Sequence, residues 1–199
     1  MVNDRHYWDN FYKENHLTKN PSSFAIYLEK KYLQQGKSLL ELGCGNGRDA
    51  LFLSEKGCLV SALDLSTQTI THLKKMNVKN VDFYNQDFSD LSKYHDFDYV
   101  YSRFTFHAID DHAEELVLNQ LPKVLTKNGL FFLEARSKKD EKLCKNYGFT
   151  HFRRFLDFDQ TITKIEDAGF RVLEKTESQG LSPYKTEDPY LIRIIAKKQ

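Results

Sequence analysis

The stretch from Ser38 to Ser66 constrains the fold of this chain more than any other part of the sequence. It predicts a short apolar strand, a glycine loop (Gly43–Gly47), a helix (Arg48–Lys56), a second apolar strand (Leu59–Leu63) and an acidic residue, Asp64, at the tip of that strand. Glycines let the backbone turn sharply and approach a ligand closely, because no Cβ stands in the way. A carboxylate about 20 residues past such a loop can accept hydrogen bonds from both ribose hydroxyls of a nucleoside. The pattern therefore predicts an adenosine-like ligand at the carboxyl end of a parallel sheet.

The spacing of the glycines separates classes of ligand. The dinucleotide fingerprint requires Gly-x-Gly-x-x-Gly, whereas here the third glycine, Gly47, comes one residue early and Arg48 takes the sixth position. The sequence also lacks the Gly-x-x-x-x-Gly-Lys-Ser/Thr string of a phosphate-binding P-loop. Taken alone, the loop is also consistent with a simple tight turn from strand to helix. Asp64 and Asp87 favour a ligand site, since both follow predicted strands.

The string Glu41-Leu42-Gly43-Cys44-Gly45-Asn46-Gly47 resembles the first motif of the class I S-adenosylmethionine-dependent methyltransferases. In that family Asp64 matches the acid that binds the ribose, and Asn85-Gln86-Asp87-Phe88 matches the segment that meets the adenine amino group. The resemblance implies a Rossmann-like α/β sheet with an antiparallel last strand and helices on both faces. It also implies S-adenosyl-L-methionine as cofactor, with Glu41 reaching its ammonium group. The implied cofactor-binding residues are Glu41, Gly43, Cys44, Gly45, Asn46, Gly47, Asp64, Leu65, Ser66, Asp87, Phe88 and Ser102.

The rest of the sequence predicts alternating helices and strands in one domain, residues 1–199. Apolar periodicity and turn residues place helices at 4–15, 24–35, 67–76, 110–125 and 158–168, and strands at 81–84, 96–102, 130–135, 170–176 and 190–197. Strand–helix alternation of this kind indicates the α/β class. Residues 1–36 are predicted to form a helical lid or to pack on the core. The long connections 137–155 and 178–189 are predicted to overhang the ligand site.

Composition excludes several classes of protein. The net charge is +1, so no global excess of charge points to nucleic acid or a membrane surface. No apolar run is long enough to span a bilayer, and the first residues are too polar for a signal peptide. Three scattered cysteines predict a reducing, cytoplasmic location, and the absence of cysteine pairs and histidine clusters predicts no metal site. The oligomeric state cannot be inferred.

Basic residues follow the ends of the two central predicted strands, where a parallel sheet binds its ligands. Guanidinium groups bind phosphates and carboxylates with two parallel hydrogen bonds, so the cluster predicts an anionic small-molecule acceptor. The alternative is that the arginines pair with Glu134, Asp140, Asp157 and Asp159. The candidate acceptor-binding residues are Tyr7, Arg103, His107, Arg136, His151 and Arg153, with Arg154 beside them.

Arg103 and His107 are also the candidate catalytic residues. His107 is interpreted as a general base, as a donor to the acceptor or as a cap of the next helix, since imidazole titrates near neutral pH. An acceptor contact is favoured over a base. Methyl transfer from a sulfonium is an in-line displacement, so positioning is the main demand on these side chains.

The sequence predicts methyl transfer to a small, anionic acceptor. Gly45-Asn46-Gly47-Arg48-Asp49, with Pro21–Ala25 before it and Ser102–Phe104 after it, resembles bacterial methyltransferases of surface-polysaccharide pathways and, less closely, those of the tellurite-resistance type. An O-methyltransferase for a sugar or phosphate-modified sugar would account for the arginines. Two alternatives stay open at this point: a nicotinamide-dependent oxidoreductase, which the glycine spacing disfavours, and an inert S-adenosylmethionine-binding domain.

Overall fold

The computed structural model describes residues 20–142, 154–184 and 186–199. The chain divides into two compact units, with the boundary between Phe88 and Ser89. The predictions that concern residues 1–19 and 143–153, among them Tyr7, His151 and Arg153, lie outside the described residues. The prediction of a single domain stays a prediction.

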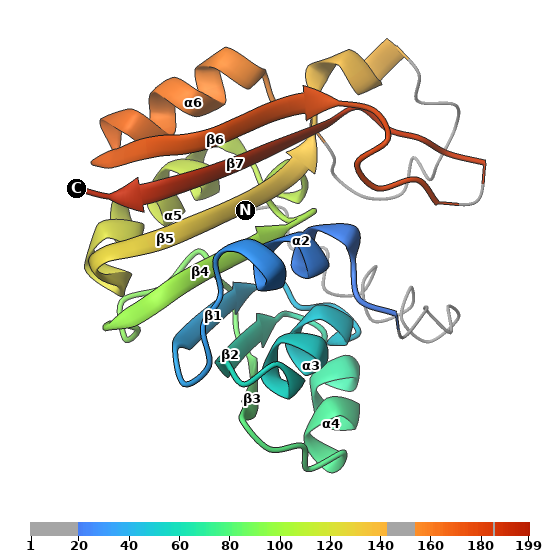
Figure 1. Cartoon of the computed structure of the whole chain (residues 1–199), viewed down its shortest axis with the longest axis vertical. Helices are drawn as coiled ribbons and strands as arrows, with labels where there is room; N and C mark the ends of the chain where they lie inside the picture. Colours follow the sequence, from blue (N-terminus) through green and yellow to red (C-terminus); the bar gives the residue numbers. More distant parts are fainter. Residues whose placement is uncertain (1–19, 143–153, 185) are drawn as a thin grey trace. The chain divides into compact units, whose positions relative to one another are not determined.

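The N-terminal unit alternates helices and parallel strands (Figure 1). Its elements are α2 (Ser23–Lys31), β1 (Ser38–Leu42), α3 (Arg48–Glu55), β2 (Leu59–Asp64), α4 (Thr67–Lys75) and β3 (Val81–Asn85). The strand order is β3-β2-β1, and both pairs are parallel, with Leu42 opposite Leu63 and Asp64 opposite Asn85. Because parallel strands end at the same edge, the glycine loop after β1 lies beside Asp64 at the end of β2.

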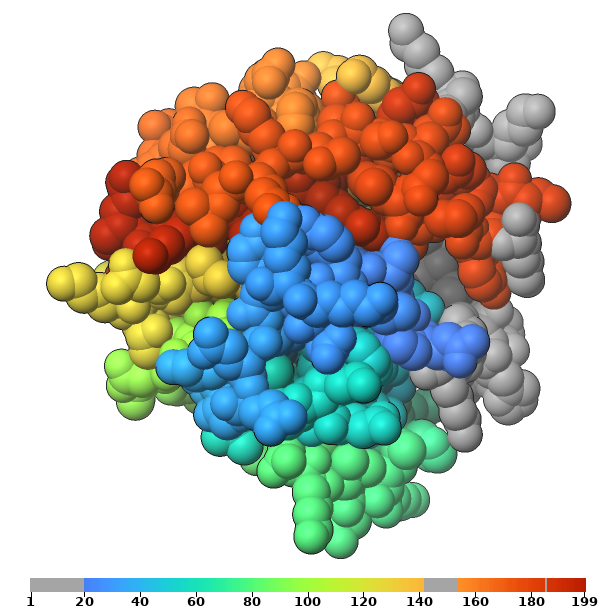
Figure 2. Space-filling model, viewed as in Figure 1, coloured from blue at the N-terminus to red at the C-terminus, as the bar shows by residue number. Residues whose placement is uncertain are grey.

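Two of the helices in this unit are joined by a buried polar contact that the sequence did not reveal. Ser22 caps α2 by accepting a hydrogen bond from Ala25 N at 3.1 Å. Its own amide and hydroxyl donate to the two carboxylate oxygens of Asp49 in α3, at 2.7 and 2.8 Å. Figure 2 shows the atoms of α2 lying against those of α3. This contact fastens the start of α2 to the helix that follows the glycine loop.

The C-terminal unit contains both parallel and antiparallel strands. Its elements are β4 (Phe97–Arg103), η1 (Phe106–Ala108), α5 (Asp111–Val124), β5 (Leu125–Arg136), η2 (Lys138–Lys142), α6 (Phe158–Asp167), β6 (Phe170–Ser178) and β7 (Leu191–Lys198). The order is β4-β5-β7-β6, and β7 runs antiparallel to both of its neighbours. Helix α5 packs on β5, and α6 packs on β6 and β7. The predicted antiparallel last strand is confirmed.

Most predicted elements agree with the structure to within two residues at each end, but α2 and β5 differ. Helix α2 ends at Lys31, four residues before the predicted end at residue 35. The predicted strand began at residue 130, directly after the turn-forming pair Asn128-Gly129, whereas β5 begins at Leu125. Asn128 takes a left-handed conformation, with φ 67°, inside this longer strand. Asn128 and Gly129 therefore form an irregularity within β5 and do not end the strand. Among the described residues, no helix is both long and apolar enough to cross a membrane.

Candidate active site

The glycine loop is held against the end of β2 by backbone hydrogen bonds. The amides of Gly43 and Cys44 both donate to the carbonyl of Leu63, at 2.9 and 2.8 Å. Gly47 ends the loop as the N-terminal cap of α3, with φ 74°. A Cβ at this position would lie 2.8 Å from Leu73 Cδ2 and 3.2 Å from Phe83 Cε1. Gly47 is therefore required both by its left-handed backbone and by close packing against α4 and β3.

The Asp64 carboxylate is a structural centre of this loop. Its Oδ2 accepts a hydrogen bond from Gly45 N at 2.8 Å, and its Oδ1 accepts one from Ser66 N at 2.8 Å. The residue is 9% exposed. Charge-assisted hydrogen bonds to backbone amides are stronger than neutral ones, so Asp64 fixes the loop as well as presenting a carboxylate at the strand tip. The sequence predicted the second role and missed the first.

Asn85 is a second residue that sequence reasoning missed. Its side-chain amide donates to the carbonyls of Asp64 and Leu65, at 3.1 and 2.9 Å, and its oxygen accepts from Thr67 Oγ1 at 3.0 Å. It therefore fixes the segment between β2 and α4. Asp87 and Phe88 follow immediately, with Asp87 half-buried and Phe88 buried. Asn85 is the first residue of the predicted adenine segment, and this position was the available signal.

Buried acidic groups surround the loop and alter its cysteine. Glu41, on β1, is 4% exposed, and Cys44 is 6% exposed. Burial raises the pKa of the Cys44 thiol well above its usual value, and the nearby charges of Asp64 and Glu41 raise it further. Cys44 is thus a neutral packing residue and not a reactive thiol.

This donor and acceptor set fits S-adenosylmethionine. Glu41 and Asp64 supply carboxylates for an ammonium group and ribose hydroxyls, and the loop residues have no large side chain that would prevent close approach. Ser102, the remaining predicted cofactor residue, belongs to the C-terminal unit. It is fully buried, and its hydroxyl is hydrogen-bonded to Thr105 Oγ1. The roles of individual residues toward the cofactor stay predictions.

The end of β4 has an unusual backbone that the sequence did not predict. Phe104 has φ 59°, a left-handed conformation that is rare for a bulky side chain and marks strain. Its amide donates to the carbonyl of Glu134 at 2.8 Å. The guanidinium carbon of Arg103 lies 4.1 Å from the centre of its ring, and the His107 ring lies 5.4 Å away. The ring of the strained residue therefore contacts both predicted catalytic side chains.

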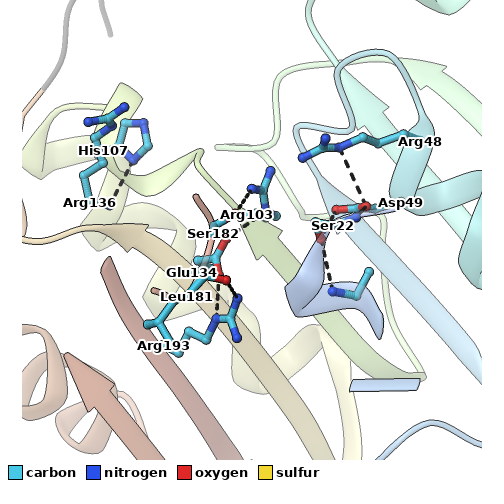
Figure 3. Close-up of polar contacts among 11 residues, drawn as sticks. Ser22, Arg48, Asp49, Arg103, His107, Glu134, Arg136, Leu181, Ser182 and Arg193 are labelled. Atoms are coloured by element: carbon cyan, nitrogen blue, oxygen red, sulfur yellow. Dashed lines mark hydrogen bonds and ion pairs between the residues drawn. The ribbon is translucent and has the colours of Figure 1, made fainter. Parts of the chain in front are cut away.

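Arg103 belongs to a buried ion-pair triad with Glu134 and Arg193 (Figure 3). Glu134 is fully buried, and its two oxygens accept from Arg103 Nε at 2.8 Å and from Arg193 Nε at 2.5 Å. The outer nitrogens of the two arginines donate to Ser182 Oγ and to the carbonyl of Leu181, at 2.9 and 2.8 Å. The triad thus anchors the connection after β6 to the ends of β4, β5 and β7. Arg193 was not among the predicted site residues.

Arg136 is paired with two carboxylates. Its Nη1 lies 2.6 Å from Asp140 Oδ2, and its Nη2 lies 3.3 Å from Glu187 Oε2. The alternative interpretation of the arginines as partners of acidic side chains therefore holds for Arg136 with Asp140 and for Arg103 with Glu134. Acceptor binding by these arginines stays a prediction.

His107 is buried, at 5% exposed, and lies beside Arg136 (Figure 3). Its Nδ1 is 3.3 Å from the backbone nitrogen of Arg136, which is the donor of that hydrogen bond. An imidazole nitrogen that accepts carries no proton, so the proton of neutral His107 is on Nε2. This arrangement favours a hydrogen-bond donor at Nε2 over a general base at that atom. The predicted cap role is not seen, since Asp110 caps α5 by accepting from Ala113 N at 2.8 Å.

Arg154 makes ion pairs and hydrogen bonds within the C-terminal unit. It forms ion pairs with Asp111 and Glu114 and donates to the carbonyl of Phe106 at 3.2 Å. Its backbone amide also donates to the carbonyl of His107 at 2.9 Å. Arg154 therefore joins η1 to the start of α5. Among the described residues, no group of three or more His, Cys, Asp or Glu side chains is placed to hold a metal ion.

Sequence comparison relates the chain to known methyltransferases. Residues 39–129 match the family described as a methyltransferase domain. The chain is 25% identical to probable (S)-tetrahydroprotoberberine N-methyltransferase 2 of Papaver bracteatum over 146 residues, which are 69% of this chain and 37% of the relative. It is 33% identical to the cypemycin N-terminal methyltransferase of a Streptomyces species over 103 residues, which are 50% of this chain and 42% of the relative. The matched region thus spans less than half the length of these curated relatives.

Solved structures show the same fold. A TehB-like S-adenosylmethionine-dependent methyltransferase from Corynebacterium glutamicum superposes with a TM-score of 0.70 at 20% identity, covering 99% of this chain and 97% of that one. The glycopeptide N-methyltransferase MtfA, complexed with S-adenosyl-L-methionine, gives a TM-score of 0.72 at 15% identity, covering 90% of this chain and 95% of that one. The predicted Rossmann-like fold is confirmed.

Proposed function

We propose that this chain, of which residues 39–129 match a methyltransferase domain, is a class I S-adenosylmethionine-dependent methyltransferase that transfers a methyl group to a small anionic acceptor. The acceptor we favour is a sugar or phosphate-modified sugar of a bacterial surface polysaccharide, methylated on oxygen in the cytoplasm. The observation that carries the proposal is the glycine loop closed on Asp64 by the 2.8 Å contact from Gly45 N. That contact fixes a carboxylate at the strand tip beside a loop that a ligand can approach.

The proposed reaction is a single displacement. When bound, S-adenosylmethionine would supply an electrophilic methyl group on a sulfonium. The acceptor atom would take this methyl group and release its own proton to solvent, with S-adenosylhomocysteine as the second product. Positioning dominates such a step. His107 is the residue to which we assign the contact with the acceptor, because its Nδ1 accepts from Arg136 N and leaves Nε2 as the donor of a neutral imidazole.

Methylation of an amine is a second candidate, because two of the similar proteins are named as N-methyltransferases and a third as an N-terminal methyltransferase. A neutral amine attacks without a base on the protein, which agrees with a His107 that donates. The two candidates differ in the atom that carries the new methyl group.

The experiment that tests the proposal uses methyl-labelled S-adenosylmethionine. Sugars, sugar phosphates, uronic acids and small amines are each incubated with the protein, and label transfer is read by mass spectrometry with fragmentation to locate the methyl group. Transfer to oxygen of an anionic sugar is expected. Transfer only to nitrogen would replace the favoured acceptor with the second candidate, and binding of S-adenosylhomocysteine without transfer to any acceptor would favour an inert binding domain.

A further inference from the structure

The two carboxylates on Arg136 are held in very different ways. Asp140 is an i,i+4 partner at 2.6 Å, its side chain is 3% exposed, and its other oxygen accepts a hydrogen bond from Tyr190 N at 3.0 Å. Glu187 comes from the connection between β6 and β7, contacts Arg136 at 3.3 Å, and is 26% exposed. Asp140 is therefore the closer and more buried counter-ion, whereas the contact of Glu187 is longer and more open to water.

The charges of this cluster do not balance. Arg136 contributes one positive charge, and Asp140 and Glu187 contribute one negative charge each. Asp140 already neutralises the Arg136 guanidinium, so Glu187 adds a second negative charge beside Asp140. The repulsion between these two carboxylates opposes the attraction of Glu187 to Arg136. Glu187 is thus the exchangeable partner of the pair.

Arg136 also lies next to His107, to which the acceptor contact is assigned above. It is the last residue of β5, and its backbone amide donates to His107 Nδ1 at 3.3 Å. The carboxyl ends of parallel strands such as β4 and β5 are where α/β sheets bind ligands. Any acidic group seated on Nη2 of Arg136 therefore occupies a position that an acceptor anion would use.

We propose that Glu187 is a specificity-determining residue, and that an acceptor binds by replacing the Glu187 carboxylate on Arg136 with a carboxylate of its own. The proposal rests on the proposed methyl transfer and narrows its acceptor to a carboxylate-bearing compound such as a uronic acid. Exchange of one monoanion for another leaves the local charge unchanged. A phosphate monoester carries up to two charges at neutral pH, so its binding would place an additional negative charge beside Asp140.

Removal of the Glu187 charge tests this exchange. When a competing internal group occupies a site nine-tenths of the time, the apparent affinity of a ligand falls about tenfold. Glu187→Gln should therefore bind D-glucuronate about five- to tenfold more tightly than the wild type. It should also reduce the preference for D-glucuronate over glucose 6-phosphate, because the cluster then has no excess negative charge. The matched control is Glu141→Gln, which removes an exposed carboxylate from η2 of the same unit.

Binding is measured by calorimetry on the full chain with S-adenosylhomocysteine present. Equal or weaker glucuronate binding by Glu187→Gln, or no detectable binding, overturns the proposal, as does an equal gain in the control. Methyl transfer is then measured separately with the same two acceptors. If glucuronate binds Glu187→Gln more tightly but is not methylated, the proposed reaction fails while the assignment of Glu187 stands.

Discussion

Neutralising Glu134 is the sharpest test of how the C-terminal unit is held together. The substitution Glu134→Gln keeps the size of the side chain but removes a charge that is fully buried between Arg103 and Arg193. Breaking a buried ion pair by removing one partner costs about 3–5 kcal/mol, because the remaining charge is left uncompensated. The guanidinium groups of Arg103 and Arg193 are 12% and 13% exposed, and each keeps a neutral hydrogen-bond partner in the connection after β6. The expected loss of stability is therefore at the lower end of this range.

We therefore expect Glu134→Gln to lower the free energy of unfolding by about 3 kcal/mol. For a chain of this size, 1 kcal/mol corresponds to a shift in Tm of about 2–4 °C, so the expected fall is roughly 6–12 °C. Urea titrations followed by circular dichroism give the free energy, and thermal melts give the Tm. An unchanged urea m-value is required, so that the difference reports stability and not a change in the unfolded state.

The control for this measurement is Glu115→Gln, which removes an exposed carboxylate from α5. It should change the free energy of unfolding by less than about 0.5 kcal/mol. A loss below about 1 kcal/mol in Glu134→Gln would refute the reasoning. In that case the arginines are adequately solvated or paired without Glu134, and the triad is not what anchors the connection after β6.

Three further predictions concern the N-terminal unit. Asp64→Asn should weaken S-adenosylhomocysteine binding more than tenfold by calorimetry and also lower stability by about 1–3 kcal/mol, since one oxygen that accepts a backbone N–H is lost; wild-type values for both would contradict its double role. Gly47→Ala should cost about 1–2 kcal/mol in urea, because alanine resists φ 74° and its Cβ would meet Leu73, and equal stability would refute the strain argument. Burial, and to a smaller extent the charge of Glu29, raises the pKa of the Cys58 thiol to about 11. The contribution of Cys58 to stability is therefore full below its unfolded pKa near 9 and is lost as the pH rises toward 11. Alkylation of Cys58 in the folded protein should stay slow at pH 8, and rapid labelling without unfolding would contradict its burial.

The parts of the site that lie within one stretch of sequence were predictable. The glycine loop, the strand before it and Asp64 follow from local spacing, since backbone turns and apolar periodicity are local properties. The order of elements followed from apolar periodicity and turn residues, and the antiparallel last strand came from the family resemblance. The structure confirms both for the residues that it describes. In contrast, Asp64 fixes the glycine loop through a hydrogen bond from Gly45 N. This bond depends on the distance between the two residues in the folded protein, so local spacing did not predict it.

The partners of the arginines were not predictable to the same degree. Arg103 and Glu134 are 31 positions apart, and Arg136 and Glu187 are 51 apart, so their pairing depends on strand register and side-chain direction. The left-handed conformation of Phe104 carries no sequence signal, because aromatic residues rarely adopt it. The positions of the basic residues in the sequence showed which strand ends carry arginines. They did not show which guanidinium groups were already paired with carboxylates.

The bridge between Ser137 and Leu156 has an evolutionary consequence. These residues pair in parallel, with Lys138 N donating to the carbonyl of Leu156 at 2.8 Å and Leu156 N donating to that of Arg136 at 3.0 Å. The pairing joins the residues that follow β5 to the segment that leads into α6. When the two ends of a connection are held together, doubling the number of residues between them costs only about 0.6 kcal/mol. Insertions and deletions between these two paired segments are therefore expected to be inherited at little cost in stability, while the register of β5 is unchanged.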